Sequence, residues 1–86
     1  MASEIRARIL ETIRENFPDR AVDRLTDDAP LADTLGLNSM QVVDLVMAFE
    51  EGFEILVPDG ELGKLTSLRA CVSFVEQALR AAGSSA

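Results

Sequence analysis

Histidine, tryptophan and tyrosine are absent from the sequence, and Cys71 is its only cysteine. Histidine is the commonest general base, so its absence excludes Ser-His and Cys-His nucleophilic catalysis and zinc sites with histidine ligands. A single cysteine cannot form an internal disulfide, which is typical of a reducing compartment. These absences argue against an enzyme and against a metal site.

Long apolar runs are also missing. Residues 1–17 interleave charged and apolar side chains, so we expect no signal peptide, no membrane span and a cytoplasmic protein. A chain of 86 residues predicts one domain with one modest core, which leaves little room for a deep active-site cleft. We expect this single domain to fold over residues 3–81 and to end in a frayed tail at 82–86.

Basic side chains are absent from residues 25–63, although the whole chain has eight Lys and Arg. The formal charge of −7 argues against nucleic acid, whose phosphates require clustered Lys and Arg. We expect the acidic middle of the chain to attract partners with basic patches. Its acids are Asp27, Asp28, Asp33, Asp44, Glu50, Glu51, Glu54, Asp59 and Glu61.

The spacing of apolar residues predicts an all-α fold. A first amphipathic helix is predicted over residues 3–17, ended by Pro18. Turn residues accumulate over 19–37 and predict a long loop. A loop of this length inside a compact domain usually has a function. We expect four apolar residues to pin this loop to the core: Val22, Leu25, Leu31 and Leu35.

The second helix is predicted to begin at Ser39. Asn38 and Gln41 have the spacing of a capping box, and Gly52 is the expected C-cap. We expect residues 53–57 to be an extended loop and residues 59–63 a short helical turn. Thr66 or Ser67 is expected to cap a last helix. Its apolar face carries Leu68, Cys71, Val72, Val75 and Leu79.

The second helix has two apolar faces. At about 100° per residue, one face is predicted to lie against the core. It consists of Val42, Leu45, Val46, Phe49 and Phe53. Met40, Val43 and Met47 form a separate stripe, which predicts an adaptable docking surface. The acids that flank the stripe are Asp44, Glu50, Glu51 and Glu54. Alternatively, the stripe packs under the long loop or the short third helix, and the acids are ordinary solvated charge.

The run from Leu35 to Met40, Leu-Gly-Leu-Asn-Ser-Met, resembles the phosphopantetheine attachment motif of the acyl carrier protein family. The resemblance extends through residues 45–53, the Pro58-Asp59 pair and Leu65-Thr66, and so covers nearly the whole chain. It implies a small four-helix bundle, with three main helices, a short helix in third place along the chain, and a long first loop. It also implies that a phosphopantetheinyl transferase attaches phosphopantetheine from coenzyme A to Ser39, beside the N-cap Asn38. The position suits the arm, because a helix N-terminus favours a phosphodiester anion.

The same resemblance assigns roles to other residues. The acids beside the stripe match the positions through which the family meets basic partner surfaces, and the stripe matches its apolar contact positions. A cavity for the acyl chain is implied at Leu31, Phe49, Val57, Leu65 and Cys71. Phe49 and Cys71 are larger than the usual leucine and alanine, so we expect a smaller cavity that favours short or polar cargo.

Two residues depart from the family pattern. Asn38 stands where the family usually has aspartate, and Gln41 stands at a frequently acidic position. Both changes remove a negative charge beside Ser39, and this indicates a specialised carrier.

The function that we expect is therefore a non-catalytic, monomeric carrier. It would hold acyl groups as thioesters for fatty-acid, polyketide or specialised lipid synthesis. Its expected partners are the transferase, loading ligases, synthases and acyltransferases with basic docking patches. An aminoacyl or peptidyl carrier, and an unmodified acidic interaction module, are the alternatives. We expect Cys71 to be a buried structural residue.

Overall fold

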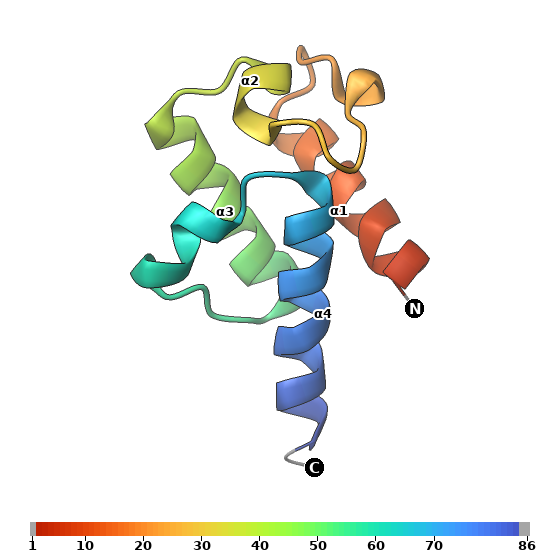
Figure 1. Cartoon of the computed structure of the whole chain (residues 1–86), viewed down its shortest axis with the longest axis vertical. Helices are drawn as coiled ribbons and strands as arrows, with labels where there is room; N and C mark the ends of the chain where they lie inside the picture. The colour runs from red at the N-terminus through yellow and green to blue at the C-terminus, as the bar shows by residue number, and fades with distance from the viewer. Residues whose placement is uncertain (1, 85–86) are drawn as a thin grey trace.

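A computed structural model of the protein describes residues 2–84. Its long helices are α1 (Ala2–Asn16), α3 (Ser39–Phe53) and α4 (Leu68–Ser84), and its short ones are η1 (Val22–Arg24), α2 (Leu31–Leu35) and η2 (Asp59–Lys64). In Figure 1, α4 runs along the long axis, α3 and η2 lie to one side of it, and α2 covers one end. Within residues 2–84 there is no β-strand, and Pro30 and Ser67 form an isolated bridge. The predicted all-α bundle is confirmed.

The three long helices enclose the core. Every buried side chain among the described residues is apolar. The long helices contribute Ile9, Ile13, Leu45, Val46, Phe49, Phe53, Leu68, Cys71 and Val75. The faces predicted from helical spacing are therefore the buried faces, with Val42, Val72 and Leu79 packed at their edges. None of the described helices is long and apolar enough to cross a membrane.

The long first loop is more structured than the sequence indicated. Val22, Leu25, Leu31 and Leu35 are all buried, as predicted. The loop also contains η1 and α2, which have three and five residues. Helices this short contain too few turns to produce the repeating apolar pattern by which helices are predicted.

Backbone and side-chain contacts tie the loop to the beginning of α4. The Arg69 N–H donates to the Asp27 carbonyl over 2.9 Å, and the Leu31 N–H donates to the Thr66 carbonyl over 2.8 Å. The Arg69 guanidinium lies 2.7 Å from the Asp28 carboxylate, and Arg6 lies 2.9 Å from that of Asp27. The hydrogen bond from Arg69, and then its charge, lower the pKa of Asp28. Both partners in the Asp28 pair are exposed, so the backbone bonds and the buried leucines fix the loop.

The C-terminal end of α3 differs from the prediction. The helix does not stop at Gly52 but continues to Phe53, and Glu54 is the C-cap, with a left-handed φ of 56°. Phe53 is buried, and Arg8 Cζ lies 4.3 Å from the centroid of its ring. The extra residue places this aromatic ring in the core, so its burial outweighs the preference for a glycine cap.

The segment after α3 is extended, as predicted, but it begins at Ile55. Ile55 and Val57 are buried, and Leu56 between them is exposed. The expected helical turn is η2, and the Ser67 hydroxyl caps α4 by accepting a hydrogen bond from the Ala70 N–H. Helix α4 continues to Ser84, so 82–84 of the expected frayed tail are helical, and 85–86 lie outside the described residues.

Candidate functional site

Ser39 is the first residue of α3 and is exposed. A short connection over residues 36–38 joins α2 to α3. Gly36 lies in it with a left-handed φ of 68°, a conformation that glycine adopts without the strain of a side chain. Leu37 is buried, and its N–H donates to the Ala32 carbonyl over 2.8 Å. The anchored turn holds the Ser39 hydroxyl at an accessible corner of the bundle.

A capping box formed by residues on either side of Ser39 is present, as predicted. Asn38 Oδ1 accepts from the Gln41 N–H over 2.8 Å, and Gln41 Oε1 accepts from the Asn38 N–H over 2.9 Å. Ser39 is not needed for the cap, and within residues 2–84 its hydroxyl makes no hydrogen bond. The first turn of α3 also contains no acidic residue. An exposed hydroxyl at a helix N-terminus without a neighbouring carboxylate is compatible with a phosphodiester anion.

The Met40, Val43 and Met47 stripe is exposed along α3, as the helical geometry predicted. The exposed fractions of these side chains are 74%, 43% and 54%. Asp44, Glu51 and Glu54 are exposed beside them, and α3 contains no basic residue. The structure therefore brings Ser39, the apolar stripe and three carboxylates together on α3 and its C-cap.

Glu50 is placed differently from the other acids of α3. It is half-buried, and its Oε2 accepts a hydrogen bond from the Val57 N–H over 2.8 Å. The resemblance implies that Glu50 meets partner surfaces with the other acids, but its carboxylate is only partly exposed and is bonded to the backbone. The contact depends on how the chain turns after α3, so helical spacing alone could not predict it.

The five residues expected to line a chain cavity are all buried, and the pockets described here bring only Leu31 and Leu65 together. Leu31 and Leu65 line an open pocket of about 220 Å³ between α2, α3 and η2. Val42, one turn after Ser39, is also part of its wall. Phe49 and Cys71 lie in the core and are 2% and 1% exposed. Val57 is also buried, so these three fill the interior rather than line this pocket.

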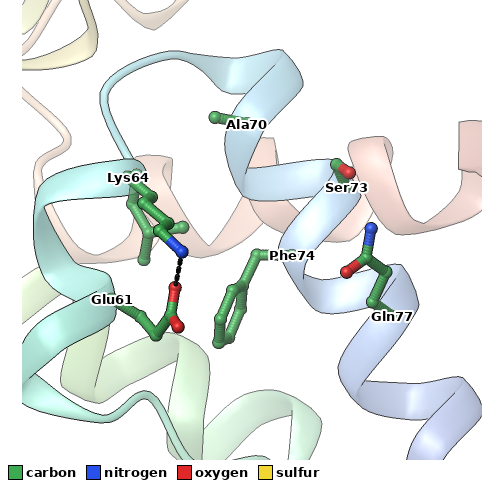
Figure 2. Close-up of a pocket in the computed structure, with 7 residues that line it drawn as sticks. Glu61, Lys64, Ala70, Ser73, Phe74 and Gln77 are labelled. Atoms are coloured by element: carbon green, nitrogen blue, oxygen red, sulfur yellow. Dashed lines mark ion pairs between the residues drawn. The ribbon is translucent and has the colours of Figure 1, made fainter.

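A second open pocket, between η2 and α4, was not predicted. Its volume is about 370 Å³, and Lys64 Nζ lies 3.0 Å from a Glu61 carboxylate oxygen at its edge. Figure 2 shows Phe74 projecting from α4 toward η2, beneath this ion pair. Leu65 also lines this pocket, so it separates the two hollows on either side of η2.

Comparisons with known proteins agree with this geometry. Residues 6–75 match the family described as "Phosphopantetheine attachment site". Over 55 residues the chain is 47% identical to an acyl carrier protein of Akkermansia muciniphila, and the alignment covers 64% of this chain and 69% of that protein. The family match includes the loop, all of α3 and most of the buried face of α4. The chain belongs to the acyl carrier protein family, carrier proteins whose covalent cofactor is phosphopantetheine.

Proposed function

We propose that Ser39 is the attachment residue of this carrier. The observation that carries the proposal is its exposed, unbonded hydroxyl at the start of α3, inside the region that matches the family. In the attachment step the Ser39 oxygen forms the phosphodiester, its proton is lost, and the nucleotide part of coenzyme A leaves. When attached, phosphopantetheine supplies a thiol that holds and activates an acyl group as a thioester.

The chain's own residues then act without catalysing a reaction. Asn38 and Gln41 hold the beginning of α3 in one conformation, so the attachment point is fixed relative to the docking face. The docking surface consists of Met40, Val43, Asp44, Met47, Glu51 and Glu54. Uncompensated carboxylates around an apolar stripe favour transferases, ligases, synthases and acyltransferases with a basic surface around an apolar recess.

The cargo that fits is a short or polar acyl group for a specialised acyl, lipid or polyketide pathway. The open pocket between α2, α3 and η2 reaches α3 at Val42, in its first turn. Beyond it the core is filled by Phe49, the largest of the fully buried side chains. A long alkyl chain would have to displace packed side chains, and closely packed interiors resist such displacement.

Ser39→Ala tests the attachment directly. Apo-protein would be incubated with coenzyme A and a broad-specificity phosphopantetheinyl transferase, and its intact mass would be measured. Wild type is expected to gain one phosphopantetheine, and Ser39→Ala none. Ser73→Ala, which changes an exposed serine of α4, is the matched control and is expected to be modified. A gain of mass in the Ser39→Ala protein would refute the assignment.

Asn38→Asp tests whether the departure beside Ser39 affects recognition. Aspartate keeps a side-chain oxygen for the cap and restores the charge that is usual in the family. We expect faster modification by the broad-specificity enzyme. Equal rates would show that Asn38 does not specialise the carrier.

A further inference from the structure

Leu56 is the most exposed of the large apolar side chains in the described part of the chain, with an exposed fraction of 83%. It lies in the extended segment after α3, between Ile55 and Val57, which are 7% and 8% exposed. Because successive side chains of an extended segment point in opposite directions, the burial of these neighbours turns Leu56 outward. A single exposed leucine is common on protein surfaces, so its placement relative to α3 decides what it does.

Glu50 fixes the segment on both sides of Leu56. The Glu50 carbonyl accepts hydrogen bonds from the N–H groups of Glu54 and Ile55, and the second of these measures 3.1 Å. Its carboxylate accepts from the Val57 N–H over 2.8 Å. Both neighbours of Leu56 are therefore bonded to one residue of α3. Met47 lies one turn before Glu50, so the segment that contains Leu56 is bonded to α3 one turn after the last residue of the exposed stripe.

The carboxylates of this region have no cationic partner within residues 2–84. Asp44, Glu51, Glu54 and Asp59 are exposed and form no ion pair there. Two other acids of the acidic middle of the chain are paired, because Glu61 pairs with Lys64, and Asp28 pairs with Arg69. Apolar side chains within a ring of unpaired carboxylates are complementary to an apolar recess surrounded by Lys and Arg.

The surface from Ser39 to Leu56 is also small enough for one partner to cover. The rise of α3 places Glu50 about 16 Å from Ser39 along the helix axis. A standard interface covers about 800 Å² on each partner, which corresponds to a patch roughly 30 Å across. An enzyme that binds the arm while it is attached to Ser39 can therefore also cover Leu56.

We propose that Leu56 is an apolar anchor for partner enzymes with a basic surface, and that Glu50 is the positioning residue that presents it. This inference rests on the proposed function, because the partner must be an enzyme that works on the carrier. It extends the docking surface beyond the stripe that helical spacing predicted. It also changes the role of Glu50 from a docking charge to a support for the neighbouring segment.

The first test measures KM and kcat for apo-protein with a phosphopantetheinyl transferase that modifies wild type. Leu56→Ser is expected to raise KM by about tenfold, a typical effect for an anchor, with little change in kcat. Leu56→Met is expected to stay within about twofold, because it keeps the apolar volume. Ala7→Ser, on an exposed position of α1, is the remote control. A wild-type KM for Leu56→Ser would overturn the inference.

The second test separates positioning by Glu50 from a direct effect of its charge. Glu50→Gln removes the charge but keeps an oxygen that can accept from the Val57 N–H, whereas Glu50→Ala removes both. We expect a KM near wild type for Glu50→Gln and a raised KM for Glu50→Ala. Adding Leu56→Ser to Glu50→Ala should raise KM little further, because both changes remove the same contact. Equal increases in KM for Glu50→Gln and Glu50→Ala would overturn the positioning role.

Intact mass separates this inference from the proposed function. If wild type gains no phosphopantetheine, the proposed function fails and this inference fails with it. If all the variants are modified at Ser39 with equal KM, this inference alone fails. Circular dichroism melts of each variant would show that the compared proteins are folded.

Discussion

The thiol of Cys71 is buried on the face of α4 that packs against the core, and desolvation raises its pKa to about 12. The thiolate is the nucleophile that attacks thiol reagents, so both the raised pKa and the lack of access protect this residue. We expect iodoacetamide at about pH 8 to leave native apo-protein unlabelled and to label the holo-protein once, on the arm. Intact mass after labelling measures this, and alkylation of Cys71 in folded apo-protein would contradict it.

The same pKa shift has a consequence for stability at alkaline pH. Above its ordinary value of 9.0 the unfolded thiol loses its proton, while the folded thiol keeps its proton until about 12. The unfolded state then binds fewer protons, so the free energy of unfolding falls as pH rises through this range. Between about pH 8 and pH 10.5, wild type is expected to lose more stability than Cys71→Ala, as urea titrations would show.

For individual residues, the sequence predicted the contacts that depend on local spacing. The Asn38 and Gln41 cap was predictable because both partners lie within one turn. The hydrogen bond from the Val57 N–H to the Glu50 carboxylate was not predictable, because only the turn after α3 brings Val57 near Glu50. The exposure of Leu56 follows from the burial of its neighbours, whereas the sequence predicted only an extended loop over residues 53–57.

Among the elements, α3 carries both the proposed attachment residue and the proposed docking face, and its C-terminal end can be tested by mutation. Gly52 lies inside the helix, and a Cβ added there would have no atom within 4 Å. Gly52→Ala is therefore expected to stabilise the protein by about 1 kcal/mol, the difference in helix propensity. Urea denaturation measures this. A loss of stability would indicate that Gly52, and not Glu54, is the left-handed cap.

The acidic face of α3 is expected to steer partners toward Ser39. Asp44→Lys with Glu51→Lys should slow association with the transferase, and added salt should weaken the wild-type interaction. Stability is expected to change by no more than about 0.5 kcal/mol, because both side chains are exposed. Glu11→Lys with Glu15→Lys makes the same change in net charge on exposed positions of α1. Equal rates for the two double variants would show that net charge, and not this face, governs association.

The elements themselves were predictable in proportion to their length. Helices α1, α3 and α4 have 15 or 17 residues and show the apolar period clearly. Helices η1 and α2 have three and five residues and show none. The end of α3 was misplaced because Gly52 is a local signal for a cap, whereas the burial of Phe53 is a tertiary effect.

For the whole molecule, we expect the filled core to limit the length of the acyl chain that the protein can shelter. Burial stabilises by about 0.8 kcal/mol for each methylene, so a sheltered chain should raise the melting temperature with each added carbon pair until the space is full. We expect wild type to reach a plateau at short acyl chains, and Phe49→Leu to reach it at longer ones. Thermal melts of both proteins loaded with a series of acyl groups measure this. A steady rise to long chains in wild type would contradict the account.

The pockets could not be predicted from the sequence. Apolar residues such as Leu31, Phe49 and Cys71 are recognisable as interior residues, and all three are buried. Whether interior residues enclose space or fill it depends on how the helices pack against each other. The pocket between η2 and α4 went unpredicted for the same reason, since it is formed by elements that meet only in the folded molecule.

Peptide mass spectrometry of the protein from cells that produce it would show whether Ser39 carries the prosthetic group. Trypsin cleaves after Arg24 and Lys64, and the peptide of residues 25–64 between them contains Ser39 as its only serine. We predict that this peptide carries phosphopantetheine, with or without a thioester-linked acyl group, and that fragmentation places it on Ser39. Finding Ser39 unmodified, or the group on another residue, would contradict the account.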